Sequence, residues 1–474
     1  MTQTSLFKFE EQTIAPIPED QRAGKSRELV AIWFGMNMTP ITVVTGALAT
    51  TVFGLSLWWA LVAMVLGHAL GGIGMALHAA QGPRLGVPQM LQARGQFGAY
   101  GAALILVIAS VMFVGFFSSN LVVASSSFAA IYPYANSGVV LVVTALISLL
   151  IAAFGYALVR RVTAIGSYVV GALVLVSFVA IAINADMGKI LGAGNFNVEG
   201  FFGMLAIGVV WQIAYAPYVS DYSRYMPAKT GASGAFWGSY TGCVSSSIIL
   251  MLLGAAVGLA AKGEDTMANL HTVLGVALGF IVLLAFALVV ATVNAVNLYC
   301  SALCTLTFLQ TFKPKWTPRV RSRLITSVVL VAVAVLIALG ASASFLTVWS
   351  NFLSILLYVL IPWSAINLVD YYLVRHADYA VKDFFTSDGG RYGRWNVGAL
   401  AVFVIGGLIQ IPFMSLTFFV GSVSEALGYV DLAWLVGFGV SGILYYIIAR
   451  AWPSFVRIDK TGANHTVGET VTNA

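Results

Sequence analysis

The chain has 474 residues, of which 59% are hydrophobic and only 9% are charged, and its mean hydropathy is +0.91. An ordinary soluble domain has about 25% charged residues, so this composition excludes a soluble globular protein. The formal net charge of +6 does not indicate a nucleic-acid partner, because the basic residues are spread over short loops and do not form a patch.

Four long segments contain no Asp, Glu, Lys or Arg, and each is long enough for two membrane crossings of about 20 residues. They are residues 29–83, 95–159, 266–312 and 324–369. Apolar stretches and the residues that interrupt them predict an all-α integral membrane protein with 12 transmembrane helices. The predicted spans, one to twelve, are 29–53, 55–80, 98–130, 138–159, 162–185, 199–225, 232–261, 271–308, 324–342, 344–372, 397–420 and 430–451.

The basic residues predict the orientation of these spans, because cytoplasmic loops collect Lys and Arg. If the N-terminus is cytoplasmic, 22 of the 24 basic residues fall inside and only Lys189 and Lys262 fall outside. A miscount of one middle span would destroy this asymmetry. The first 28 residues are polar and contain acidic residues such as Glu10 and Glu11, unlike a cleavable signal peptide. We expect a multi-pass protein of the plasma (inner) membrane with both termini in the cytoplasm.

Two spans carry a proline near their middle, where proline removes a backbone hydrogen bond and interrupts the helix. Pro40 follows Gly35 to Thr39 in span one, and Pro217 follows Tyr215 in span six. Spans one and six are the first members of two five-span halves, and an odd number of spans inverts the second half in the membrane. Interrupted helices at matching positions predict a transport site at the midplane, whereas two unrelated proline kinks are the alternative.

The predicted spans and their two halves divide the chain into five parts. They are a cytoplasmic tail (1–28), a first five-helix half (29–185), a second, inverted half (199–372), two further transmembrane helices (397–451) and a second cytoplasmic tail (452–474).

Few charged residues lie near the apolar stretches. Asp221 and Asp370 lie at predicted inner ends, where Arg224 and Arg375 follow them, and we interpret both as structural. The substrate is therefore expected to be neutral. The three cysteines lie in apolar segments and support neither a disulfide framework nor a zinc site. No metalloprotease motif or nucleophile elbow is present, so neither an enzyme nor a resident cofactor is expected.

Amide and aromatic side chains gather near the middles of four spans. They are Asn37 and Thr39 in span one, Phe116 and Asn120 in span three, Trp211, Gln212 and Tyr215 in span six, and Asn294 and Asn297 in span eight. An amide without a partner in hydrocarbon is unfavourable, so these groups must meet one another, water or a ligand. Each alone is as well explained by contacts between helices. Together they predict a site for a flat, neutral heterocycle, because aromatic faces stack on a ring while amides both donate and accept hydrogen bonds.

Several stretches of the chain together resemble the nucleobase–cation symport-1 family, in particular its purine and cytosine permease branch. They are residues 33–37 (WFGMN), 81–90 (QGPRLGVPQM), 221–225 (DYSRY), 297–299 (NLY) with Ser301, and 361–362 (IP) with Asp370 and Tyr371. The resemblance covers residues 28–450. It implies a LeuT-type fold with a 5+5 inverted repeat and two extra C-terminal helices, and a symporter that imports nucleobases such as cytosine or a purine.

The resemblance also implies roles for individual residues. A span-three aromatic residue and an amide four residues later, here Phe116 and Asn120, would stack on and hydrogen-bond the base, although many members have Trp at the first position. The span-six aromatic residue would be Tyr215 or Trp211, and the span-eight amide would be Asn297.

The resemblance implies a coupling cation, either sodium or a proton. A sodium ion would lie between span-one carbonyls, from Gly35 to Met38, and the Thr292 hydroxyl of span eight. His68 and His78 in span two are alternative groups for proton coupling, although a histidine bonded within the core is the more common case.

Other readings stay open at the level of sequence. The same fold serves other substrates, such as a vitamin precursor, an allantoin-like or hydantoin-like ureide, or an amino acid. A channel is less favoured, because the polar residues cluster at one depth instead of lining whole spans. The sequence makes no prediction about the oligomeric state.

Overall fold

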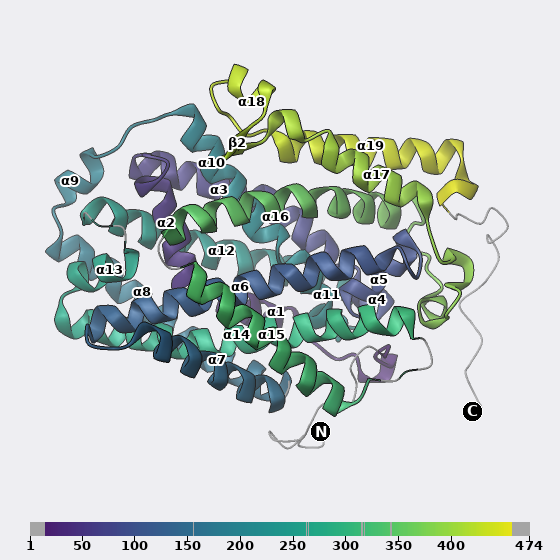
Figure 1. The fold of residues 1–474 in the computed structure, drawn as a ribbon, viewed down its shortest axis with the longest axis horizontal. Helices are drawn as coiled ribbons and strands as arrows, with labels where there is room; N and C mark the ends of the chain where they lie inside the picture. The colour runs from purple at the N-terminus through teal and green to yellow at the C-terminus, as the bar shows by residue number, and fades with distance from the viewer. Residues whose placement is uncertain are drawn as a thin grey trace.

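A computed structural model describes residues 15–456, except 155, 262, 264, 314, 315, 317, 342 and 343. Long helices run roughly parallel to the longest axis of the molecule (Figure 1). Among the described residues, the strands are a two-stranded antiparallel ribbon of β1 (Ser415–Leu416) and β2 (Phe419–Val420). The protein is therefore all-α, as its composition predicts.

Each of the twelve predicted ranges contains a helix. The main helices are α1 (Ser26–Met36), α2 (Pro40–Thr51), α3 (Leu57–Ala79), α6 (Ala102–Ile131), α7 (Ser137–Phe154), α8 (Tyr156–Asn184), α10 (Val198–Ile213), α11 (Ala216–Ser223), α12 (Gly231–Ala260), α14 (Val276–Phe312), α15 (Val320–Gly340), α16 (Phe345–Leu368), α17 (Val397–Leu408) and α19 (Ala433–Ala451). The shorter helices are α4 (Gly82–Leu85), α5 (Gln89–Phe97), α9 (Met187–Gly192), α13 (Thr266–Leu274) and α18 (Ser422–Ala426).

In the part of the chain that the structure describes, eight helices are long and apolar enough to cross a membrane, and α1 and α2 make a ninth if they form one span. Three shorter apolar helices lie at residues 137–153, 168–184 and 397–413. These numbers agree with a multi-pass membrane protein, while the total of twelve crossings stays a prediction.

Apart from the two proline-containing spans, predicted ranges eight and eleven are also not single helices. In range eight, Gly275 has a φ of +78° and separates α13 from α14, because glycine readily takes the left-handed conformation that ends a helix. In range eleven, α17 ends at Leu408, and a 3₁₀ turn (Ile411–Phe413) with Pro412 leads into the β1–β2 ribbon. Proline lacks the N–H group that would continue the helix.

The two proline-containing spans are interrupted to different degrees. Asn37, Met38 and Thr39 separate α1 from α2, and the two helices are bent by 64°. Pro40 is the first residue of α2, a position where proline loses no helical hydrogen bond. In span six, only Ala214 and Tyr215 separate α10 from α11, and the two segments still read as one apolar span.

Small residues let the helices around these breaks approach closely, as they do in other membrane bundles. A Cβ atom on Gly46 of α2 would lie 2.0 Å from the carbonyl oxygen of Met251 in α12. A Cβ atom on Gly67 of α3 would lie 2.4 Å from the carbonyl oxygen of Leu205 in α10. Helices α3, α10, α2 and α12 therefore pack backbone to backbone around the interrupted spans.

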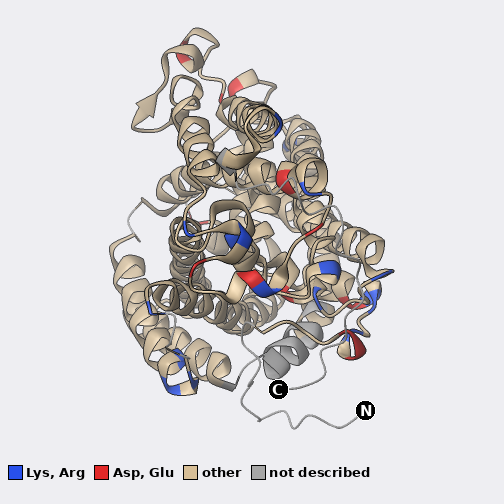
Figure 2. Cartoon of the chain, turned by 90° about the vertical axis from the view of Figure 1, so that its right-hand side faces the viewer, with Lys and Arg blue, Asp and Glu red and all other residues tan. Residues whose placement is uncertain are grey.

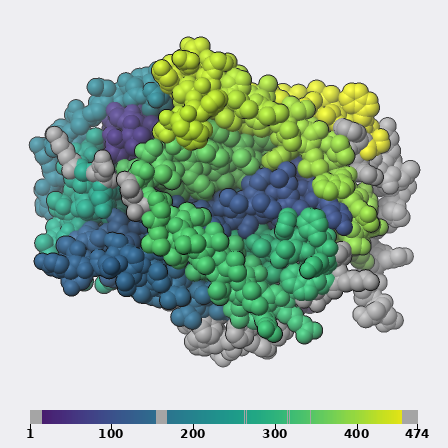
Figure 3. Space-filling model, in the orientation of Figure 1, coloured from purple at the N-terminus to yellow at the C-terminus, as the bar shows by residue number. Residues whose placement is uncertain are grey.

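One end of the molecule is closed by short elements. Every residue of α5 is buried, and α5 packs near two 3₁₀ turns, Val381–Phe385 and Gly390–Tyr392. Figure 3 shows α5 and the beginning of α6 between α16 above and α15 below. Figure 2 looks onto this end, where Lys and Arg residues gather, whereas Lys189 lies on α9 at the opposite end (Figure 1).

Candidate functional site

A cavity lies beside the break between α1 and α2. About 430 Å³ between its walls is free of protein atoms, part of it open to solvent. Its walls come from α1, α2, α6, α10, α11, α14 and the two breaks. The lining residues are Met36, Thr39, Ile41, Met112, Phe113, Phe116, Asn120, Trp211, Ala214, Tyr215, Tyr218, Val293 and Asn297.

Asn37 fixes two aromatic side chains of the cavity wall, Trp211 and Tyr215, by hydrogen bonds. Its Oδ1 accepts hydrogen bonds from Trp211 Nε1 and from the Tyr215 hydroxyl, both at 2.7 Å. Its Nδ2 donates to the Trp33 carbonyl at 3.1 Å and to Ser246 Oγ at 3.0 Å. Asn37 is fully buried and does not line the cavity, so it positions other residues instead of facing the cavity as the sequence predicted.

A pair of amide side chains, Asn120 and Asn294, connects α6 with α14. Asn120 Nδ2 donates to Asn294 Oδ1 at 3.0 Å, and Asn294 Nδ2 donates to the Phe117 carbonyl at 3.1 Å. Asn294 is fully buried and does not reach the cavity. It fixes the Asn120 amide, whose buried Oδ1 has no hydrogen-bond partner among the described residues. Asn120, which lines the cavity, therefore keeps an unused acceptor.

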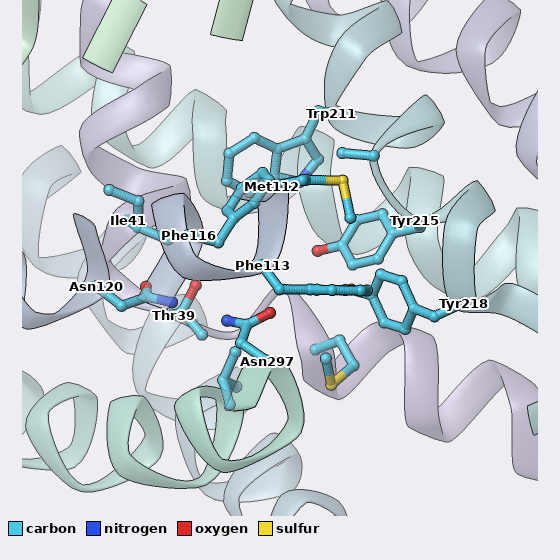
Figure 4. A pocket seen from close by; sticks show the side chains of 13 residues that line it. Thr39, Ile41, Met112, Phe113, Phe116, Asn120, Trp211, Tyr215, Tyr218 and Asn297 are labelled. Carbon is cyan, nitrogen blue, oxygen red and sulfur yellow. The ribbon is translucent and has the colours of Figure 1, made fainter. Parts of the chain in front are cut away.

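Two further polar side chains face the same cavity. Thr42 Oγ1 donates its proton to the Asn37 carbonyl at 2.8 Å, so Thr39 is the donor in the 3.1 Å contact between the Thr39 and Thr42 hydroxyls. This leaves the lone pairs of Thr39 free to accept. Asn297 makes no side-chain hydrogen bond with another described residue. Figure 4 shows Asn297 near Thr39 and Asn120, across the cavity from Trp211 and Tyr215.

Aromatic rings make up much of the remaining wall. Phe116 contacts Trp211 edge to face, with ring centroids 6.0 Å apart, and Phe113 contacts Tyr218 in the same way at 5.1 Å. Phe117 is buried outside the cavity. Stacking surfaces and unused amide groups thus occupy one site.

Gln212 was predicted to belong to the site, but the structure places it elsewhere. Its Nε2 contacts His68 Nδ1 at 3.0 Å and Ser247 Oγ at 3.2 Å. Gln212 follows Trp211, and successive helical residues point about 100° apart. His68 also contacts Met251 Sδ at 3.2 Å, and the ring of His78 stacks on Trp363. Neither histidine lines the cavity.

The residues expected at a sodium site have the oxygen atoms that hard cations prefer. The Gly35 carbonyl accepts the Met38 amide at 3.0 Å, and Thr292 Oγ1 donates to the Val289 carbonyl at 2.8 Å. Both oxygens keep at least one lone pair. Gly35, Met38 and Thr292 thus fit a sodium ion by their donor chemistry, and all three are buried.

Asp221 and Asp370 have structural contacts, as the sequence suggested. Asp221 Oδ1 accepts the backbone N–H of Gln89 at 2.8 Å, so it caps the first turn of α5. Asp370 forms a salt bridge with Arg375 at 3.0 Å and accepts a hydrogen bond from the Tyr445 hydroxyl at 2.7 Å. Neither carboxylate lines the cavity, which agrees with a neutral ligand.

Several lining residues were not predicted from the sequence. Phe113 lies three residues before Phe116, and Tyr218 lies three residues after Tyr215, so helical spacing could have identified both. Met36, Ile41, Met112, Ala214 and Val293 carry no signal that separates them from other apolar residues of their helices.

Comparison with known proteins agrees with this arrangement of a helical membrane fold around a small-molecule cavity. A protein-family model described as "Permease for cytosine/purines, uracil, thiamine, allantoin" matches residues 16–437. The chain belongs to this permease family, which is the nucleobase–cation symport-1 family, and to its purine and cytosine branch. It is therefore a multi-pass membrane permease.

Two relatives illustrate this membership. YxlA of Bacillus subtilis, provisionally named a purine-cytosine permease, is 39% identical over 94% of this chain and 96% of its own length. The purine-cytosine permease FCY21 of Saccharomyces cerevisiae is 25% identical over 93% of this chain and 86% of its own length.

Solved structures show the same fold. The nucleobase–cation symport-1 transporter Mhp1, in a closed conformation with bromovinylhydantoin bound, superimposes with a TM-score of 0.78 at 18% identity. The match covers 96% of this chain and 98% of Mhp1. A sodium-coupled sialic acid symporter gives a TM-score of 0.62 at 12% identity, covering 93% of each chain. At these identities the likeness establishes the LeuT-type fold alone.

Proposed function

We propose that this permease imports a neutral, planar nucleobase of the cytosine or purine type by cation-coupled alternating access. It acts in the plasma (inner) membrane with both termini in the cytoplasm. Residues 29–185 and 199–372 form the two inverted halves, and 397–451 form the two helices outside the repeat. The clustering of basic residues at one end of the molecule supports this orientation.

The observation that carries the proposal is a set of unused polar groups beside aromatic faces. Asn120 Oδ1 is buried without a partner, and an unpaired buried acceptor is destabilising by about 1 to 3 kcal/mol. Asn297 offers both a donor and an acceptor, and Thr39 offers an acceptor. A ring edge with N–H donors and one acceptor, such as that of cytosine or a purine, would satisfy these groups together.

Other substrate classes fit the cavity less well. Among the residues that the structure describes, no Asp, Glu, Lys or Arg lines it, so the carboxylate of an amino acid would have no ionic partner there. A sugar would need hydroxyl partners on many sides, whereas Thr39, Asn120 and Asn297 lie together on one side (Figure 4). A ureide such as allantoin, or a hydantoin, also has N–H donors and carbonyl acceptors, so it is the alternative substrate class.

Sodium or a proton would couple the transport. The oxygen atoms of Gly35, Met38 and Thr292 support a sodium ion between span one and span eight. No resident cofactor is required.

Uptake into proteoliposomes tests the function. The purified protein would be reconstituted and supplied with labelled cytosine, adenine or allantoin, with and without a sodium gradient and with a proton gradient alone. We expect saturable uptake of a base that other bases inhibit. Uptake of allantoin that no base inhibits would favour the ureide alternative, and flux that does not saturate would indicate a channel.

A further inference from the structure

A second pocket lies away from the substrate cavity, where α5, the end of α14 and the 3₁₀ turn at residues 381–385 meet. About 360 Å³ between its walls is free of protein atoms, part of it open to solvent. Its lining residues are Arg94, Ala99, Gln310, Thr311, Phe385, Thr386 and Ser387. The pocket belongs to the end of the molecule where basic residues gather (Figure 2), which is the proposed cytoplasmic end.

Arg94 is a buried cation without an ionic partner. Its side chain is only 7% exposed, its Nη1 donates to the Phe384 carbonyl at 2.7 Å, and its Nη2 donates to Thr311 Oγ1 at 3.2 Å. Its Nε has no hydrogen-bond partner. Among the residues that the structure describes, no carboxylate forms a salt bridge with Arg94.

The nearest acidic residues along the adjoining loop are engaged with other groups. Asp383 pairs with Arg391 at 3.7 Å, and Asp388 accepts the backbone N–H of Gly390 at 3.0 Å. Burial lowers the pKa of the Arg94 guanidinium to about 10, so the group still carries its charge near neutral pH. A buried charge is costly unless a counter-ion neutralises it.

A purely structural role would explain only part of this arrangement. The two hydrogen bonds of Arg94 connect α5 with α14 and with the loop after α16. Neutral donors would form the same bonds without a desolvated charge. The charge, the unpaired Nε and the adjacent pocket are the features that call for an anion.

The chemistry of the pocket is that of a phosphate site. Guanidinium groups bind phosphate oxygens with strong, charge-assisted hydrogen bonds. Ser387 adds a hydroxyl donor from the exposed side and Gln310 adds an amide, whereas the Thr386 hydroxyl already donates to the Asp383 carbonyl at 2.9 Å. A carboxylate of a small metabolite would use fewer of these donors than a phosphate would.

The rim of the pocket indicates where the phosphate comes from. Phe312 and Phe385 are 53% and 40% exposed, and Trp395 is 50% exposed. Tyr100 joins them, since its ring lies 5.6 Å from Phe312 and 5.9 Å from Trp395 between centroids. Exposed aromatic rings of this kind gather at the level of lipid headgroups, where basic pockets between membrane helices bind anionic headgroups.

We propose that this pocket binds the phosphate group of an anionic phospholipid. The Arg94 guanidinium is the ionic partner, the Ser387 hydroxyl and the Gln310 amide are further donors, and the exposed aromatic rim contacts the glycerol and upper acyl region. The bound lipid would join α5 to the end of α14, two elements that flank the proposed cytoplasmic end of the substrate cavity. The inference concerns a lipid and does not depend on which substrate is carried.

Lipid-dependent thermal stability of the full-length, detergent-purified protein tests this site. Phosphatidylglycerol and phosphatidylcholine with identical acyl chains would be titrated separately, and inorganic phosphate would be titrated in a third series. We expect phosphatidylglycerol to raise the unfolding temperature more than phosphatidylcholine does. Arg94→Gln should weaken the apparent affinity for phosphatidylglycerol about tenfold or more, as expected for the loss of hydrogen bonds to a charged group.

Matched variants separate this site from general charge effects. Arg391→Gln removes an exposed charge from the same loop region, outside the pocket, and should keep the full preference for phosphatidylglycerol. Arg94→Lys should keep part of it. If Arg94→Gln does not fold, Ser387→Ala, which removes an exposed hydroxyl donor of the pocket, must weaken the lipid effect instead.

Three results would overturn the proposal. They are equal stabilisation of the wild-type protein by the two lipids, unchanged selectivity in every pocket variant that folds, and equal protection by inorganic phosphate. The last result would show that the site takes a free anion instead of a lipid.

Discussion

At the scale of single residues, Asn37 is the group on which two cavity walls depend. Asn37→Ala would leave the indole N–H of Trp211 and the hydroxyl of Tyr215 without their shared acceptor. Each buried donor left unpaired is destabilising by about 1 to 3 kcal/mol. We expect both a lower unfolding temperature in detergent and weaker substrate binding. Loss of binding at unchanged thermal stability would contradict this positioning role and indicate direct contact with the substrate.

Asn297 should behave differently, because its amide makes no side-chain hydrogen bond with another described residue. Asn297→Ala would leave the ring edge unpaired, so the dissociation constant of the best substrate should rise roughly ten- to a hundredfold, equivalent to about 1 to 3 kcal/mol. The unfolding temperature without substrate should change little. Binding measured by calorimetry decides the point, and an unchanged affinity would remove Asn297 from the site.

Phe116 tests whether the aromatic wall stacks on a flat ring. Stacking contributes about 0.5 to 1.5 kcal/mol beyond burial, so Phe116→Leu should weaken binding several-fold while the protein stays folded. Phe116→Trp should be tolerated, since it keeps an aromatic face in the wall. If Phe116 only packs against neighbours such as Trp211, the order reverses, because Leu would be harmless to binding and Trp would overpack. Phe117→Leu is the control for binding, since Phe117 does not line the cavity.

At the scale of elements, the prolines predicted where the helices are interrupted, but not how strongly. Both Pro40 and Pro217 lie near the start of the helix that follows a break, yet only the first break bends the chain by 64°. The first break has three residues, and the Thr42 hydroxyl donates to the Asn37 carbonyl within it, while span six has two intervening residues. The Asn37 side chain also donates to Ser246 of α12, a contact with a neighbouring helix that is not visible in a local pattern.

Helical spacing identifies only part of the site. Asn294 and Asn297 are three residues apart and so share one helical face. Only Asn297 reaches the cavity, because Asn294 is bonded to Asn120 and to the Phe117 carbonyl. The sequence could identify which helices contribute polar groups. Which of two neighbouring amides faces a ligand depends on contacts between α6 and α14, which only the fold determines.

The cap that Asp221 provides for α5 gives a prediction at the same scale. Asp221→Ala would remove the acceptor of the Gln89 N–H, and losses of helix caps are destabilising by about 0.5 to 2 kcal/mol. We expect a lower unfolding temperature. The substrate affinity of the folded protein should be unchanged, because Asp221 does not line the cavity. A selective loss of affinity at constant unfolding temperature would instead connect Asp221 with the substrate.

At the scale of the whole molecule, composition and the distribution of Lys and Arg were sufficient to predict a helical membrane protein. Hydrocarbon leaves no solvent for backbone groups, so helices are among the few structures that can span it. Because the spans must be apolar, the residues that line the substrate cavity are difficult to identify from the sequence. Apolar residues such as Met112 and Val293 line the cavity, but in the sequence they do not differ from residues that face lipid.

The proposed coupling is also a property of the whole molecule, because it would link spans one and eight to the substrate cavity. If Thr292 supplies a sodium ligand, Thr292→Ala should reduce the dependence of substrate affinity on sodium, since linkage between two binding sites is reciprocal. Substrate titrations at several sodium concentrations, for the wild-type and variant proteins, measure this dependence. Thr292→Ser keeps the hydroxyl and should keep the sodium dependence, which separates a lost ligand from altered packing.

Wild-type transport that does not depend on sodium and follows a proton gradient would refute the sodium site. His68 would then be the first residue to replace, because it contacts Gln212, the residue next to the cavity-lining Trp211.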